Sequence, residues 1–110
     1  MRQIDISSLD SLERKLYQLI ISRLDGDKLA SDDYREGIRR LVGKGLGGFI
    51  IFGGERDGTR AFIKELQALA AIPLFIASDI ERGVAQQIEG TSPFPCQMAV
   101  AAAINRNNPD

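Results

Sequence analysis

Two carboxylates follow a short apolar run in residues 73–95, PLFIASDIERGVAQQIEGTSPFP. Asp79 ends that run, and Glu81 comes two residues later. In parallel α/β folds ligands bind at the carboxyl ends of the strands, which is the position that Asp79 would occupy. An ionised carboxylate makes strong hydrogen bonds to hydroxyl groups, such as those of a sugar. Asp79 is therefore the first candidate for a substrate-binding residue.

The rest of the loop supplies hydrogen-bond donors. Arg82, Gln86 and Gln87 could meet sugar hydroxyls, carboxylates or phosphate. A purely structural interpretation is equally compatible with the spacing: Asp79 would cap the turn, and Glu81 would pair with Arg82 at the surface.

Asp79 and Glu81 could in principle be the catalytic pair of a glycosidase, because that acid–base chemistry needs two carboxyl groups across the scissile bond. Residues two apart in an extended loop do not easily flank a sugar from opposite faces. We therefore expect one substrate-binding carboxylate here.

Several other chemistries are excluded by composition. The chain has no histidine and one cysteine, Cys96, so a Ser-His-Asp triad, a Cys-His dyad and a histidine-ligated metal site are ruled out for these residues. Cys96 is expected to be buried filler. The glycine-rich stretch at 43–48 precedes a strand, and the loop at 52–58 lacks both nucleotide-binding spacings, so neither predicts a phosphate site. No metal and no cofactor is predicted.

The charge balance, the hydropathy and the N-terminus indicate which classes of partner and which location to expect. Fourteen basic and 15 acidic residues give a net charge of −1, without a basic stripe, so nucleic acid is not an expected partner. No apolar run reaches membrane-spanning length. The N-terminus lacks the apolar core of a secretory signal, and a single cysteine suits a reducing compartment, so a cytoplasmic location is expected.

Alternating helices and strands must position the loop. Apolar residues at helical spacing begin at residue 11, with Asp10 and Glu13 in the form of a capping box, and Gly43 and Gly45 are expected to stop a second helix that begins after Ser31. The expected helices are 11–24, 32–45, 59–71 and 96–104. Two apolar runs, 47–52 and 74–78, are expected to be strands covered on both faces.

The order strand, helix, strand predicts a parallel crossover and an α/β fold. Two strands covered on both faces need a larger sheet or barrel around them. As written, the chain would leave a strand edge and much apolar surface open. We therefore expect residues 1–110 to be the opening of a domain that continues beyond Asp110.

Three stretches, in their order and spacing, resemble the start of the catalytic domain of glycoside hydrolase family 3. SLERKLYQLI is similar to that family's LEEKIGQL opening, and GGFIIFGG is similar to its G-G-x-I-L-F strand. PLFIASDIERGVAQQIEGTSPFPCQMAVAAA is similar to P-L-x-x-x-D-x-E-G-G-R-V-x-R followed by F-P-x-x-M-A-L-(G/A)-A. The resemblance covers residues 8–103. It implies the first strands and helices of a (β/α)8 TIM barrel whose enzymes remove β-linked sugars from the non-reducing end with retention.

The resemblance also implies site residues. Asp79 matches the aspartate that binds sugar hydroxyls in the −1 subsite. An arginine that contacts substrate in the N-acetylglucosaminidase branch falls on Gln87, which becomes the second substrate-binding candidate. Arg82 occupies a glycine position of the family pattern, and Val84 an arginine position. Gln86 could also donate to the substrate in place of the missing arginine.

Three residues of the loop are expected to shape it. They are Glu81, Arg82 and Gly83. Gly83 would do so through a backbone angle that a side chain would hinder.

No catalytic residue is expected within this chain, because the family's nucleophile and acid/base lie beyond the equivalent of Asp110. The chain alone is then expected to be inactive, with a carbohydrate substrate and the C-terminal part of the same barrel as its partners. The short opening and the D-x-E-x-G loop favour a β-N-acetylhexosaminidase that releases terminal β-linked N-acetylglucosamine. The alternatives are a β-glucosidase or β-xylosidase of the same family, and a non-catalytic sugar-binding or interaction module.

Overall fold

The computed structural model describes residue 4 and residues 6–107 of the chain. Its helices and strands are, in order, α1 (Leu12–Gln18), β1 (Ile21–Asp25), α2 (Asp32–Gly43), β2 (Gly48–Phe52), α3 (Arg56–Leu69), β3 (Phe75–Ser78) and α4 (Gln97–Asn107). Three short 3-10 turns, η1 (Ile6–Ser8), η2 (Gly26–Lys28) and η3 (Val84–Gln86), lie between them. The predicted α/β class is confirmed at this level.

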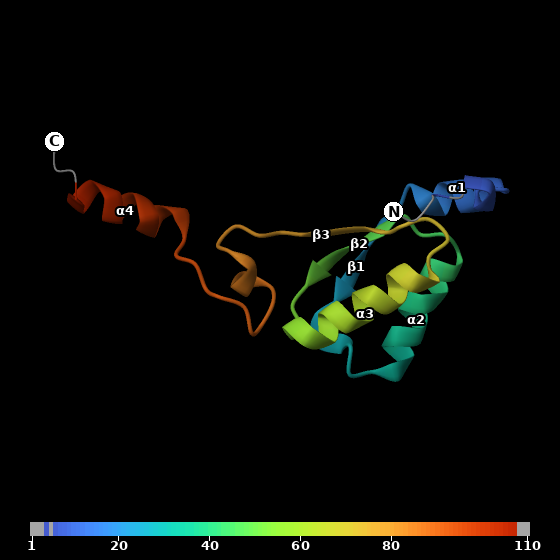
Figure 1. The fold of residues 1–110 in the computed structure, drawn as a ribbon, viewed down its shortest axis with the longest axis horizontal. Coiled ribbons are helices and arrows are strands. Elements are labelled where there is room, and N and C mark those ends of the chain that lie inside the picture. The colour runs from blue at the N-terminus through green and yellow to red at the C-terminus, as the bar shows by residue number, and fades with distance from the viewer. Residues whose placement is uncertain (1–3, 5, 108–110) are drawn as a thin grey trace.

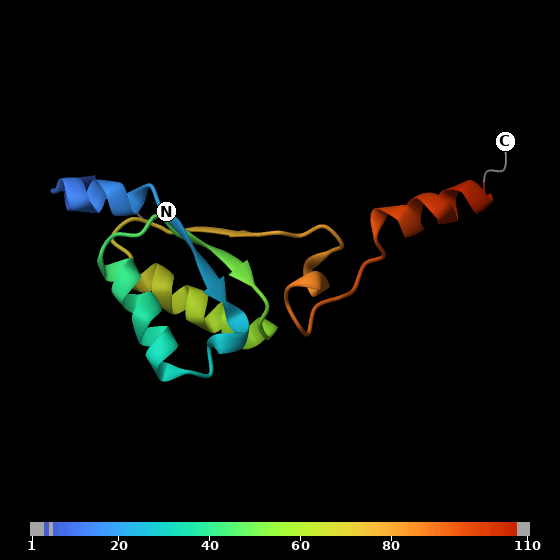
Figure 2. The ribbon, with the colours of Figure 1, turned by 180° about the vertical axis from the view of Figure 1, so that it is seen from behind.

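The three strands form a parallel sheet in the order β1-β2-β3. Ile21 pairs with Gly48 at the start of β1, and Gly48 in turn pairs with Phe75 of β3. Two successive strand–helix–strand units build this sheet, and their crossover helices α2 and α3 lie side by side on one face of it (Figures 1 and 2). The carboxyl ends of all three strands therefore meet at one edge, next to the loops that follow them.

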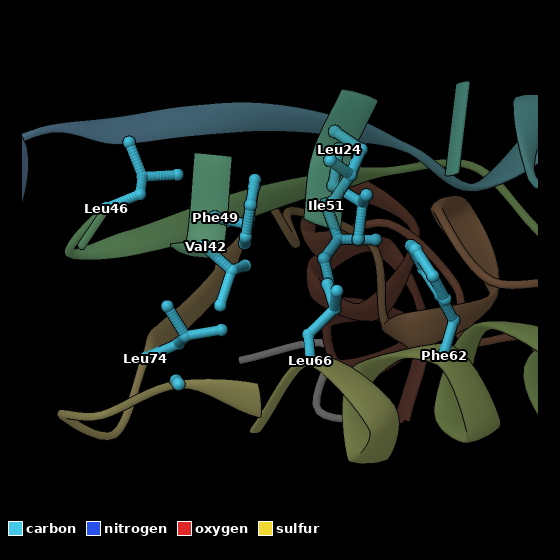
Figure 3. Close-up of a cluster of buried hydrophobic side chains, with 10 residues drawn as sticks. Leu24, Val42, Leu46, Phe49, Ile51, Phe62, Leu66 and Leu74 are labelled. Carbon is cyan, nitrogen blue, oxygen red and sulfur yellow. The ribbon is translucent and has the colours of Figure 1, made fainter. Parts of the chain in front are cut away.

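The core lies between the sheet and these two helices. Leu24 of β1, Phe49 of β2 and Leu66 of α3 are completely buried at its centre (Figure 3). Burial of such a side chain contributes about 1.5–3 kcal/mol to folding. The remaining buried apolar residues of this cluster are Ile38, Val42, Leu46, Ile51, Phe62, Ala70 and Leu74.

The second predicted helix is confirmed. Ser31 caps it: its hydroxyl oxygen accepts a hydrogen bond from the amide of Tyr34 at 3.3 Å. The helix ends at Gly43, and Gly45 follows with a φ of +94°, a conformation that glycine adopts without steric cost.

The first predicted helix is wrong beyond Gln18. The helical spacing predicts a helix through Leu24, but α1 ends at Gln18, and residues 21–25 form strand β1 beside β2. Leu24 is buried because it faces the core from this strand. The predicted capping box is also wrong, since Ser11 is the cap and accepts from the amide of Arg14 at 3.2 Å.

Two further expectations need correction. The third helix begins at Arg56, three residues before the predicted start, because the side chain of Glu55 caps it. The run 74–78 is a strand, but it is not covered on both faces: Phe75 is 71% exposed, and Leu74, just before the strand, is the buried residue of that run. β3 has a strand partner on one side only among the described residues.

The molecule is elongated, because α4 stands apart from the sheet at the end of an extended segment (Figure 1). Its radius of gyration is 18.3 Å, against about 13 Å for a compact domain of this length. None of the helices in the described part of the chain has the length and apolar character needed to cross a membrane.

The expected open apolar surface is present. Its large exposed side chains include Leu12, Leu16, Leu19, Ile20, Ile21, Leu69, Phe75, Ile76, Phe94, Met98 and Ile104.

Candidate functional site at the carboxyl edge of the sheet

The ends of β1 and β2 are joined by Asp27. Its carboxylate accepts a hydrogen bond from the amide of Gly54 at 2.9 Å. Gly53 and Gly54 have φ angles of +66° and +105°, so the loop after β2 turns in a conformation that favours glycine. A Cβ atom on Gly54 would lie 2.6 Å from the hydroxyl of Thr59 and 2.7 Å from the Cα of Gly26. The two loops are therefore packed backbone against backbone.

Gln87 joins the ends of β2 and β3. Its Oε1 accepts a hydrogen bond from the amide of Gly53 at 3.3 Å, and its Nε2 donates to the carbonyl oxygen of Asp79 at 3.1 Å. Gln87 was predicted to bind substrate. The structure gives its amide two bonds within the protein, and both hold the loop that carries Asp79.

Asp79 lies directly after β3, which ends at Ser78. Its side chain is exposed, and its carboxylate forms no hydrogen bond or ion pair with any other residue that the structure describes. The neighbouring Ser78 is fixed, because its hydroxyl donates to the carbonyl oxygen of Ile51 at 2.9 Å. Asp79 is thus anchored by its backbone, and its carboxylate is open to a ligand.

The alternative structural role of this loop has no support in the geometry. Asp79 caps no turn with its side chain, and Glu81 and Arg82 form no ion pair within the described residues. Instead the side-chain oxygen of Gln86 accepts from the amides of both Glu81 and Arg82, at 2.9 Å each. Gln86 therefore shapes the loop, a role that had not been predicted for it.

Gly83 has a φ of +83° and a ψ of 166°. This is the kind of backbone angle that the sequence predicted for it. A Cβ atom at this position would also lie 2.9 Å from the Cβ of Phe94. The loop thus needs glycine both for its backbone and for its contact with Phe94.

The loop after η3 runs alongside the loop after β2. The amide of Glu89 donates to the carbonyl oxygen of Gly54 at 2.9 Å, and the amide of Arg56 donates to the carbonyl oxygen of Glu89 at 3.0 Å. Arg56 Nη1 also donates to the carbonyl oxygen of Gly90 at 3.2 Å. These bonds hold residues 89–90 at the edge of the sheet, next to the loop after β2.

The Glu55 carboxylate is occupied at the start of α3. It accepts hydrogen bonds from the amides of Asp57 and Gly58, at 2.8 Å each. These two bonds lower the pKa of Glu55 below its usual value. Glu55 is therefore a structural carboxylate, which distinguishes it from Asp79.

Among the described residues, no group of three or more His, Cys, Asp or Glu side chains is arranged to hold a metal ion. Cys96 is half-buried at the start of α4, not fully buried as expected. Sequence reasoning missed Asp27 and gave Gln86 a different role, as a donor to the substrate; in the structure both side chains hold loops in place. For Asp27, the available signal was its position just after an apolar run, once that run is recognised as a strand.

The sequence matches no family model and no curated protein.

Proposed function

We propose that the loop after β3 binds the terminal sugar of a β-linked glycoside through Asp79, as the first part of a retaining, exo-acting glycoside hydrolase of family 3. The substrate proposed is a terminal β-linked N-acetylglucosamine. The observation that carries the proposal is the exposed Asp79 carboxylate at the carboxyl end of a parallel strand, where α/β folds bind ligands.

The contacts around Asp79 support this role. Gln87 and Ser78 hold the backbone on either side, so the carboxylate is positioned without being neutralised. A sugar hydroxyl that donates to it would form a charge-assisted bond, which is stronger than a neutral one. Such bonds can strengthen further as the ring distorts toward an oxocarbenium-like transition state.

The parallel sheet supports the barrel part of the proposal. Two consecutive strand–helix–strand units, with both helices on one face, are the repeating pattern of a (β/α)8 barrel. The opposite face of the sheet carries Arg23 stacked over the ring of Phe52, with 4.4 Å between guanidinium and ring centre. In a barrel this face would be directed inward. The nucleophile and the acid/base are proposed to come from the remainder of that barrel.

Kinetics of the Asp79→Ala variant test the proposal in the enzyme that contains this chain. With a chromogenic β-N-acetylglucosaminide, kcat/KM should fall by several orders of magnitude, because the lost bonds are made in the transition state. A fall of less than about tenfold would contradict a substrate-binding role. Glu36→Ala, on the exposed side of α2, is the matched control and should leave kcat/KM unchanged.

A further inference from the structure

A hollow of about 380 Å³ lies at the carboxyl edge of the sheet, between the loops after β1 and β2 and the start of α3. Gly54 connects its walls, because its amide donates to Asp27 at 2.9 Å and its carbonyl oxygen accepts from the amide of Glu89 at 2.9 Å. None of the large exposed apolar side chains of the open surface lines this hollow. It therefore lies between two paired strands and is bounded by contacts within the chain.

The lining of the hollow is acidic. Its charged side chains are Asp27, Glu55 and Glu89, and no basic residue lines it. Asp27 uses Oδ1 for the amide of Gly54, whereas its Oδ2 and the Glu89 carboxylate form no hydrogen bond or ion pair with the described residues. Since these side chains are not arranged to hold a metal ion, the negative charge of the hollow suits an organic cation.

A buried hydroxyl group without a partner lies beside the same hollow. Thr59 is only 3% exposed, and its Oγ1 forms no hydrogen bond within the described residues. A Cβ atom on Gly54 would lie 2.6 Å from this Oγ1 and 2.7 Å from the Cα of Gly26, so the hydroxyl is on the side of the hollow that Gly26 lines. Because an unpartnered buried hydroxyl costs about 1–3 kcal/mol, it points to a hydrogen-bond partner from outside the chain.

We propose that this hollow binds an aliphatic diamine. One ammonium group pairs with Asp27 and the other with Glu89, which flank Gly54 from two different loops, and an ammonium N–H donates to Thr59 Oγ1. Glu55, whose oxygens accept from backbone amides, contributes a third negative charge. A donor to Thr59 and two separated carboxylates explain why two ammonium groups fit better than one.

The remaining lining suits the methylene chain of such a ligand. Leu29 and Ala30 supply apolar surface between the charged groups. Ligand pockets combine apolar walls with a few polar groups that fix orientation, and drug-sized ligands occupy roughly 300–1,000 Å³, so a hollow of about 380 Å³ accommodates a short alkyl chain. The site contains neither Asp79 nor Gln87, and it is independent of the proposed binding of a sugar.

Three probes with the same four-carbon chain test the proposal: 1,4-diaminobutane, n-butylamine and 1,4-butanediol. In titrations of the 110-residue chain followed by ¹H–¹⁵N correlation spectra at low salt, the diamine should bind about fivefold more tightly than the monoamine, the range of one exposed ion pair. The diol should not bind, and added salt should weaken the diamine. The shifts should centre on the amides of Gly58, Thr59 and Glu89.

Thr59→Val separates a ligand-binding hydroxyl from a structural one, because valine keeps the shape and removes the oxygen. The variant should bind the diamine about tenfold more weakly, as expected for loss of a hydrogen bond to a charged group. Its urea midpoint should stay the same or rise, since the hydroxyl has no partner within the described chain. A lower midpoint would show that the protein itself uses this hydroxyl and would overturn the proposal.

A pair of charge variants completes the test. Glu89→Gln should weaken the diamine about fivefold. Glu36→Gln removes the same charge from the exposed side of α2, outside the hollow, and should leave the affinity unchanged. No binding of the diamine, equal binding of diamine and monoamine, equal effects of the two charge variants, or Ca²⁺ binding as tight as that of the diamine would each contradict a diamine site.

Discussion

The side chain of Gln87 donates a hydrogen bond to the carbonyl oxygen of Asp79 at 3.1 Å, while it accepts one from the amide of Gly53 at 3.3 Å. One amide group thereby ties the loop after β3 to the end of β2. The bond is made to the backbone of Asp79, so the carboxylate itself stays exposed. A carboxylate that binds a ligand is best held in this way, since a partner on its oxygens would compete with the ligand.

Removal of the Gln87 side chain should loosen this tie. In Gln87→Ala, the amide of Gly53 loses its acceptor, and its hydrogen exchange should become about fivefold faster, as expected for a net loss near 1 kcal/mol. Exchange measured by NMR at single residues gives the answer. The amide of Gly54, which is bonded to Asp27, serves as the internal reference and should keep its rate.

The reciprocal variant checks that this effect is local. Asp27→Ala should accelerate exchange at Gly54 and leave Gly53 close to its original rate. If either variant accelerates both amides equally, the two side chains act only through global stability, and the assignment of separate ties is wrong.

Gly54 should not tolerate a side chain. Its φ of +105° and the short approach of a Cβ atom to Thr59 predict that Gly54→Ala lowers the free energy of unfolding by about 1–3 kcal/mol. Urea unfolding measures the change.

Gly37→Ala is the matched control. This glycine lies within α2, and nothing lies within 4 Å of the position of an added Cβ. The substitution should therefore stabilise the protein by about 0.5–1 kcal/mol through helix propensity. Equal effects of the two substitutions would refute the packing argument at Gly54.

Glu55 should make stability depend on pH. Hydrogen bonds from the amides of Asp57 and Gly58 lower the pKa of Glu55, so its charged form stabilises the fold. That contribution is fully present above the unfolded pKa of about 4.3 and is lost as the pH falls through the lower pKa of the folded state. Glu55→Gln should thus be less stable than the native chain near neutral pH, and the difference should shrink in acid.

Urea midpoints at neutral and acidic pH test this sign. Glu36→Gln is the control, since Glu36 has only an exposed ion pair with Arg39 at 3.5 Å, a kind of pair that contributes little. A difference between Glu55→Gln and the native chain that grows in acid would show that the Glu55 carboxylate does not stabilise the helix start.

Local signals predicted the parts of the fold that depend on local contacts. The start of α2 after Ser31 and its stop at Gly43 are encoded within one turn of the helix, and both were predicted from the sequence. β2 was equally clear, because the run ending at Phe52 is apolar and rich in branched residues. For Gly83, the residue type alone predicted a backbone angle that a side chain would hinder, and its φ is +83°.

Strand β1 was missed because its apolar residues also fit helical spacing. What makes residues 21–25 a strand is pairing with residues 48–52, more than twenty positions away, and no local pattern contains that partner. Gly47 assists: its amide donates to the carbonyl oxygens of Tyr17 and Ile20, at 3.1 Å each, which closes α1 against the start of β2. The adjacent β-branched residues Ile20 and Ile21 were the local indication of a strand.

The site was predictable only in outline. The position of Asp79 followed from the rule that parallel strands end at a common edge. The roles of Gln86 and Gln87 did not, because a glutamine amide can serve a ligand or the backbone equally well, and only the folded loop decides between them. The role of Asp27 was not predicted either, because strand β1, which precedes it, was not recognised.

The most direct test of the account is a titration of the 110-residue chain with methyl N-acetyl-β-D-glucosaminide, followed by ¹H–¹⁵N correlation spectra of the native chain and of Asp79→Asn. The account predicts shifts at residues 79–87 of the native chain, and their loss in the variant while the other resonances stay in place. Identical shifts in both proteins, or no shift in the native loop, would contradict the claim that Asp79 binds a sugar.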